Sequence, residues 1–246
     1  MSGLLAWQIA TVTEIGVETP TVKSFTFALP AFRPHLAGQH YDLRLTAEDG
    51  YQAQRSYSIA SEPMRAGEVV LTVERIPDGE VSTYLHDVVV PGDRAELRGP
   101  IGGYFVWEDA SGGPLLLIAG GSGVVPLLSM LRHRAGAGSH VPTALVCSSR
   151  TREDVIAFDE VAALAAADPS LHVLQTLTRS QPPGWTGLAR RIDREMLAEA
   201  IGLLGGPPRT FICGPTLLVE AAAEALVDLG LAPAQIKTER FGPTGA

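Results

Sequence analysis

Hydrophobic and polar residues alternate along short segments in the first half of the chain, which is the pattern of half-buried β-strands. Turn signals such as Asp49-Gly50 and Pro77-Asp78-Gly79 separate these segments. The pattern predicts six strands, over residues 7–14, 22–28, 41–46, 56–60, 68–75 and 94–98. One helix is expected near residues 82–88, with Ser82 or Thr83 as its N-cap. Six short strands at this spacing predict a small closed antiparallel barrel.

The second half changes to apolar runs that alternate with helical patterns. It predicts five strands, over residues 115–119, 143–147, 172–177, 210–213 and 236–238. Helices are expected between them, over residues 124–135, 157–166, 194–203 and 216–229. Strands that alternate with helices predict a parallel, doubly wound sheet covered on both faces. The fold class is therefore an all-β domain over residues 1–110 followed by an α/β domain over residues 111–246, with the glycine-rich stretch 99–114 as the crossover.

The segment LLLIAGGSGVVPLLSM, residues 115–130, predicts a buried strand, a tight glycine turn and a helix start. Backbone N–H groups at such a turn point outward, where they and the helix dipole favour a phosphate. Pro126 stands where the usual dinucleotide fingerprint has its third glycine, and it falls in the first helical turn, where a missing N–H costs little. An ordinary strand-to-helix turn is the alternative interpretation.

The segment Arg55-Ser56-Tyr57-Ser58 follows a run of short β-type segments. Strand geometry sends Arg55 and Tyr57 to one face, and Ser56 and Ser58 to the other. An arginine suits a diphosphate, a tyrosine suits an aromatic ring, and a serine hydroxyl suits a ring nitrogen. A half-exposed strand with a surface arginine and tyrosine is the alternative.

Several motifs occur together in one order along the chain. They are RSYS at 55–58, GEVSTYL at 79–85, GPIG at 99–102, GGSGVVP at 120–126, CGP at 213–215 and ERF at 239–241. This ordered set, which covers nearly the whole chain, resembles the ferredoxin–NADP reductase-like family of flavoprotein oxidoreductases. The resemblance implies that the barrel binds FAD and that the α/β domain binds NADP(H), or NAD(H), as substrate.

The resemblance also implies roles for individual residues. Arg55 would bind the FAD diphosphate, Tyr57 would stack on the isoalloxazine and Ser58 would bond its N5, with Ser56 beside them. The segment Val81-Ser82-Thr83 would hold the diphosphate from the other side, unless its hydroxyls form only a helix cap. The turn residues Gly120, Gly121, Ser122 and Gly123 would receive the nicotinamide-nucleotide pyrophosphate.

The family places the cysteine of Cys213-Gly214-Pro215 against the nicotinamide, a carboxylate such as Glu239 near the contact of the two rings, and often a C-terminal aromatic, here Phe241, over the flavin. Ser58, Cys213 and Glu239 are thus the candidate catalytic residues. Phe241 is not terminal, because residues 242–246 follow it. A buried structural cysteine is the alternative for Cys213. A Cys147–Cys213 disulfide is not expected, since a sheet order 3-2-1-4-5 separates their strands by about 9–10 Å.

The end of the second parallel strand bears on the choice of nucleotide. A ribose 2′-hydroxyl usually meets an acid there, whereas a 2′-phosphate meets arginine. Here the strand leads into Ser149, Arg150 and Arg152, with no acid before Glu153. Two hydroxyls and two guanidiniums suit a phosphate, and Arg179 and Arg191 are candidates to join them. NADPH is therefore expected rather than NADH, with a solvated arginine loop as the alternative.

Composition narrows the class of protein. No apolar stretch approaches the roughly 18 residues that span a bilayer, and the N-terminus lacks the features of a signal peptide, so the cytoplasm is expected. The first 110 residues carry 8 Lys and Arg against 15 Asp and Glu, which disfavours nucleic acid and anionic lipid. The six histidines and two cysteines have no metal-ligand spacing, so no metal and no iron–sulfur cluster is expected.

The sequence therefore predicts a monomeric FAD-dependent oxidoreductase that takes hydride from NADPH, or NADH. It would pass electrons to a separate protein such as a ferredoxin, a flavodoxin or an oxygenase or metalloenzyme component. A flavin or ferric reductase that uses diffusible flavin or small acceptors is the alternative enzyme. A regulatory or assembly subunit that binds cofactor without turnover is a third hypothesis, which the complete motifs disfavour.

Overall fold

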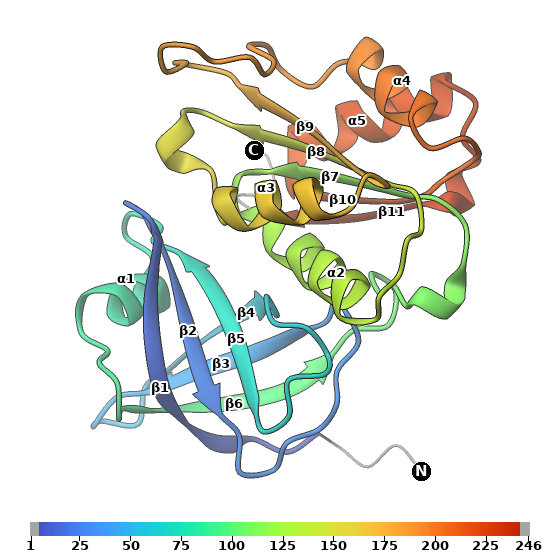
Figure 1. Cartoon of the computed structure of the whole chain (residues 1–246). Coiled ribbons are helices and arrows are strands. Elements are labelled where there is room, and N and C mark those ends of the chain that lie inside the picture. The colour runs from blue at the N-terminus through green and yellow to red at the C-terminus, as the bar shows by residue number, and fades with distance from the viewer. Residues whose placement is uncertain (1–4, 242–246) are drawn as a thin grey trace. The chain divides into compact units, whose positions relative to one another are not determined.

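The computed structural model describes residues 5–241, which form two compact units (Figure 1). The first unit holds the described residues up to Glu108 together with Leu128–His133, and the second holds the remainder. The units divide helix α2 (Val124–Gly136) between them, so a domain boundary at residue 110 stays a prediction.

The first unit is a six-stranded antiparallel sheet in the order β4-β3-β6-β1-β2-β5, as the alternating pattern predicted. Its strands are β1 (Gln8–Thr19), β2 (Val22–Ala28), β3 (His40–Thr46), β4 (Gln52–Ser58), β5 (Glu68–Glu74) and β6 (Arg94–Ile101). The sheet curls, because Ile59, directly after β4, forms a bridge to Leu71 in β5. Phe25, Phe27, Leu43 and Leu97 are fully buried in the core that this curvature encloses.

Three details of the barrel differ from the prediction. Strand β4 spans Gln52–Ser58 and not residues 56–60, because its polar side chains hide the alternation at the edge of the sheet. Strands β1 and β6 run further than expected, to Thr19 and Ile101. Helix α1 (Glu80–Asp87) begins before Ser82, with Gly79 as its N-cap, so the cap predicted at Ser82 or Thr83 is wrong.

The second unit is a five-stranded parallel sheet in the order β11-β10-β7-β8-β9, which is the predicted 3-2-1-4-5 arrangement counted from its other edge. The strands are β7 (Leu115–Gly120), β8 (Thr143–Ser149), β9 (Leu171–Leu177), β10 (Arg209–Pro215) and β11 (Ile236–Phe241). Helices α4 (Arg194–Gly202) and α5 (Thr216–Asp228) cover one face, and α3 (Phe158–Ala167) covers the other (Figure 1). Every residue of β7 is buried, as expected for the central strand.

The turn after β7 is locked against the end of β10. A Cβ atom on Gly123 would lie 2.1 Å from the carbonyl oxygen of Cys213 and 2.8 Å from the nitrogen of Gly214. A Cβ on Gly214 would in turn lie 3.1 Å from the nitrogen of Gly120. The two backbones therefore approach closely only because these positions lack side chains. Glycine at residues 120, 123 and 214 is a packing requirement as well as a turn signal.

We expect Gly123→Ala to destabilise the protein by about 1–3 kcal/mol, because the added methyl overlaps a backbone carbonyl that cannot rotate away. Gly202→Ala is the matched control, since a Cβ at Gly202 meets no described atom within 4 Å and alanine favours the helix. Urea denaturation of both variants measures the difference. Equal stabilities would show that the turn and the strand end can separate without cost.

Candidate nucleotide and flavin sites

The glycine turn has the geometry of an anion cradle. Residues Gly121–Gly123 form one turn of 3-10 helix between β7 and α2. Gly121 has a φ of +54°, and a Cβ there would point into space open to every described atom within 4 Å. Among residues 5–241, neither a side-chain cap nor an acidic residue occupies this turn. Gly120, Gly121, Ser122 and Gly123 thus present the start of a helix to a phosphate, as predicted from the sequence.

Strand pairing brings three predicted residues to the same edge of the sheet. Cys213 in β10 lies opposite Ala119 in β7 on one side and opposite Glu239 in β11 on the other. Gly214 and Pro215 follow it, and Pro215 lies opposite Phe241. Cys213 is 4% exposed, and burial raises the pKa of its thiol, so it is a small neutral group. The tail at residues 242–246 lies outside the described residues.

Glu239 is a partly buried carboxylate with few compensating contacts. Burial raises its pKa from 4.5 to about 7. Near neutral pH the side chain therefore exists in both protonation states. A group in this condition can hold or release a proton at the edge of the sheet, next to Cys213.

The ends of β8 and β9 are tied together by main-chain hydrogen bonds. The N–H groups of Thr178 and Arg179 donate to the carbonyl oxygens of Ser149 and Arg150, both at 2.9 Å. The structure thus brings Ser149, Arg150 and Arg179 into one loop cluster, as the 2′-phosphate hypothesis requires. The carbonyl of Arg190 accepts a hydrogen bond from Thr176, which places the chain next to Arg191 beside the same strand end.

Arg152 has a different environment from the one expected. Its guanidinium lies 3.4 Å from the ring centroid of Phe158 and 3.4 Å from a carboxylate oxygen of Asp159. The cation–π contact fixes the side chain on α3. Its charge remains close to the loop cluster, but part of its hydrogen-bonding capacity is already used.

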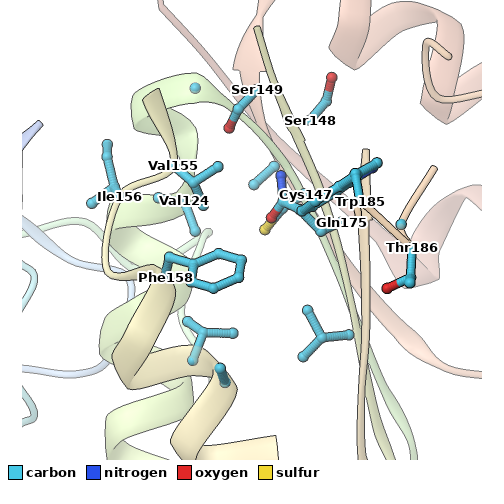
Figure 2. Close-up of a pocket in the computed structure, with 16 residues that line it drawn as sticks. Val124, Cys147, Ser148, Ser149, Val155, Ile156, Phe158, Gln175, Trp185 and Thr186 are labelled. Atoms are coloured by element: carbon cyan, nitrogen blue, oxygen red, sulfur yellow. The ribbon is translucent and has the colours of Figure 1, made fainter. Parts of the chain in front are cut away.

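A pocket of about 350 Å³ opens beside this cluster, between α3 and strands β8 and β9 (Figure 2). Phe158 projects into it, Val155 and Ile156 line the α3 side, and Cys147 and Trp185 line the other (Figure 2). Burial raises the pKa of Cys147 to about 12, so its thiol is neutral and both cysteines are free. The sequence analysis missed Phe158 and Trp185, although a flat, mostly apolar pocket suits a nucleoside base.

The two faces of β4 carry different chemistry, as alternation predicted. Arg55 lies opposite Leu43 and Tyr57 lies opposite Tyr41, on the face that carries the core residue Ala53. Tyr57 is half-buried, and burial raises its pKa to about 12, so its hydroxyl stays neutral. Arg55 is exposed, with one hydrogen bond to the carbonyl of Gln54 at 2.6 Å. An exposed arginine beside a half-buried aromatic ring fits the diphosphate and the ring of a flavin.

The opposite face of β4 holds a network that the sequence analysis did not find. The hydroxyl of Ser56 donates to Asp42 at 2.6 Å, and Arg98 donates to the other oxygen of Asp42 at 2.7 Å. Burial raises the pKa of Asp42, but these two hydrogen bonds outweigh that effect and hold it below its ordinary value. Ser56 thus binds the protein itself. Ser58, at the end of the strand, lies opposite His40 and is half-buried.

The predicted diphosphate segment Val81-Ser82-Thr83 lies in the first turn of α1, which packs beside β4. The hydroxyls of Ser82 and Thr83 both donate to the carbonyl of Gly79, at 3.3 Å and 2.7 Å. Helix geometry leaves the first N–H groups without partners inside the helix. The backbone, and not these hydroxyls, is therefore the donor that α1 offers to an anion, opposite the guanidinium of Arg55.

Residues 5–241 contain no group of three or more histidine, cysteine or acidic side chains that could hold a metal. No helix among them is long and apolar enough to cross a membrane.

Two family models match the chain. Residues 9–106 match the oxidoreductase FAD-binding domain, and residues 117–224 match the oxidoreductase NAD-binding domain. The chain therefore contains a domain of each kind, in the order predicted. FAD and a nicotinamide nucleotide are the cofactors that these domains bind, and the residues present fit both groups.

Curated relatives agree. The chain is 35% identical to ferredoxin–NADP reductase B of Sorangium cellulosum over 237 residues, covering 94% of this chain and 91% of the relative. It is 31% identical to the reductase component of phenol 2-monooxygenase from a Pseudomonas strain and 32% identical to the glycine betaine monooxygenase reductase subunit of Chromohalobacter salexigens. These matches cover 91% and 93% of this chain, but only 62% of each of those two relatives.

Solved structures show the same architecture. The FAD/NAD-binding domain of nitric oxide dioxygenase from Vibrio cholerae superposes with a TM-score of 0.84 at 25% identity, covering 96% of this chain and 99% of that one. A ferredoxin NADP+ reductase from Neisseria gonorrhoeae, with FAD and NADP bound, superposes with a TM-score of 0.80 at 25% identity, covering 95% and 98%.

The raised pKa of Glu239 makes the protein's stability depend on pH. The folded state binds this proton more tightly than the unfolded chain, so the carboxyl disfavours folding increasingly as pH rises from 4.5 to about 7. We expect Glu239→Gln to remove this loss and to gain about 2 kcal/mol over wild type above pH 7. Urea denaturation of the full chain across pH 4.5–8 measures the effect.

Glu220→Gln is the control for this experiment, because Glu220 is an exposed glutamate on α5. The control should follow the wild-type pH profile. If Glu239→Gln also runs parallel to wild type at every pH, the carboxyl of Glu239 is solvated and its pKa is ordinary.

Proposed function

Because the chain belongs to the ferredoxin–NADP reductase-like family of FAD- and NAD(P)-dependent flavoproteins, we propose that it is an NAD(P)H-dependent flavoprotein reductase. One observation carries this proposal beyond family membership. The anion cradle at Gly121–Gly123 is packed against the strand end that bears Cys213, and Glu239 lies opposite that cysteine. A nucleotide whose pyrophosphate occupies the cradle would thus have its reactive end beside a small neutral thiol and a titratable carboxyl.

The bound flavin would supply the acceptor for a hydride from the nicotinamide, and it would pass electrons on to a further acceptor. The protein's part is to bind and orient. Arg55 and the first turn of α1 would hold the FAD diphosphate, Tyr57 would pack on the ring, and Ser58 would offer a hydroxyl at its edge. Cys213 would leave room for the nicotinamide and exclude water, since its buried thiol stays protonated.

The separate electron acceptor is the second part of the proposal. The phenol and glycine betaine relatives are, by name, reductase components of monooxygenases, and the Sorangium relative is a ferredoxin reductase. We therefore expect a ferredoxin, a flavodoxin or an oxygenase component as acceptor, with the reaction taking place in the cytoplasm. A flavin or ferric reductase is the second candidate, since the sequence leaves the acceptor open.

The test begins with the colour and activity of the purified full chain. We expect a yellow protein that releases FAD on heating and oxidises NADPH with a dye as acceptor. We expect Arg55→Ala to weaken FAD affinity about ten- to a hundredfold, through loss of a charge-assisted contact with the diphosphate. Arg65→Ala is the control, because Arg65 pairs with Glu68 on the surface. Colourless wild-type protein that turns over added free flavin would favour the second candidate.

Nucleotide choice gives a further test, which concerns the loop cluster at the ends of β8 and β9. We expect Arg150→Ala with Arg152→Ala to shift the preference away from NADPH about a hundredfold, because two guanidiniums leave the 2′-phosphate. The effect should appear mainly in KM, since this contact is remote from the reacting atoms. Steady-state kinetics with NADPH and NADH measure it.

Arg209→Ala is the matched control, because Arg209 starts β10 at the opposite end of the sheet. It should leave the ratio of NADPH to NADH efficiency unchanged. A wild-type enzyme that uses NADH equally well, or a double variant that loses both nucleotides equally, would mean that the arginine loop is only a solvated surface.

A further inference from the structure

A second, larger pocket lies in the first unit, on the far side of Arg55 from Tyr57. It has a volume of about 700 Å³ and is enclosed by the hairpin between β3 and β4, by α1 and by β6. This volume is in the range of small-molecule sites in proteins. Nothing said above about the flavin ring or the nicotinamide nucleotide uses it.

Tyr51 and Tyr84 give this pocket its aromatic wall. Tyr51, in the hairpin, is 57% exposed, and its hydroxyl donates to Glu80, the first residue of α1, at 3.1 Å. Tyr84 lies one helical turn after Glu80 and is 45% exposed. Leu45 and Ala53 add an apolar floor. A large exposed ring that is held in place by a hydrogen bond, with an open pocket beside it, is a platform for a flat ligand.

The position of Tyr51 along the chain matters more than its exposure. The N–H of Ala47 donates to the carbonyl of Tyr51 at 2.9 Å, so Tyr51 continues the ladder of β3 and β4 by one residue. Alternation then places Tyr51, Arg55 and Tyr57 on one face of the extended strand. At about 3.4 Å per residue, Tyr57 and Tyr51 are separated by roughly 20 Å, with Arg55 between them.

FAD has the same order of chemical groups. Its isoalloxazine and adenine are flat rings at the two ends of an extended molecule, and its diphosphate lies between them. The guanidinium of Arg55 is close enough to Tyr51 to act on it electrostatically, and Glu80 ties Tyr51 to the helix start that faces the diphosphate. We infer that FAD lies extended along β4, with its adenine stacked on Tyr51 at the mouth of this pocket. This inference rests on the proposed function, because it requires that the barrel bind FAD.

The experiment compares FAD with FMN, which lacks the adenosine monophosphate half. Each flavin is titrated into flavin-depleted full-length chain, and the quenching of flavin fluorescence gives its Kd. We expect Tyr51→Ala to weaken FAD about tenfold and to leave the Kd of FMN unchanged, since stacking of a base on an aromatic ring contributes on this scale. Tyr51→Phe keeps the ring and should bind FAD like wild type, although it loses the hydrogen bond to Glu80.

Tyr104→Ala is the matched control, because Tyr104 is a tyrosine of similar exposure, 60%, in the same unit. It should change neither Kd. Equal loss of FAD and FMN in Tyr51→Ala, or no loss of either, would overturn the adenine assignment while leaving the proposed function intact. Wild-type protein that binds neither flavin would overturn the proposed function itself, and the assignment with it.

Discussion

The close approach of two backbones, the turn after β7 and the end of β10, is the constraint on which the nucleotide half of the molecule depends. Side chains cannot separate these segments, because a Cβ on Gly123 would overlap the carbonyl of Cys213. The contact fixes the start of α2 relative to the sheet edge that carries Cys213 and, through strand pairing, Glu239. A phosphate cradle and a reactive edge are therefore positioned by one packing interaction, without a dedicated side chain.

Strand β4 has the corresponding role in the barrel, by a different physical means. Its inner face carries Arg55 and Tyr57 toward the gap that α1 fills, while its outer face anchors the strand through Ser56, Asp42 and Arg98. Two charges and a hydroxyl that satisfy one another hold the strand in register. An edge strand with polar residues on both sides would otherwise be weakly specified. The outer network thus positions the inner face.

The same distinction explains what the sequence could predict. Alternation and periodicity depend on burial, so they predicted eleven strands, the parallel sheet order and the glycine turn. They misplaced β4, where both faces are polar, and the cap of α1, where serine and threonine bond back to Gly79 from inside the helix. Asp42, Phe158 and Trp185 could not be found, since their partners Ser56, Arg152 and Leu188 come together only in the folded chain or have no motif of their own.

The net charge of −8 seems at odds with a protein built to hold two diphosphates and a 2′-phosphate, but the anion sites do not depend on it. At physiological ionic strength exposed charges are screened beyond about 8 Å, so a phosphate responds to the donors within one or two residues of it. Those donors are helix N–H groups at Gly79 and at Gly121–Gly123, with Arg55, Arg150 and Arg179 beside them. Acidic residues elsewhere then affect the approach of a charged partner much more than the binding of the cofactors.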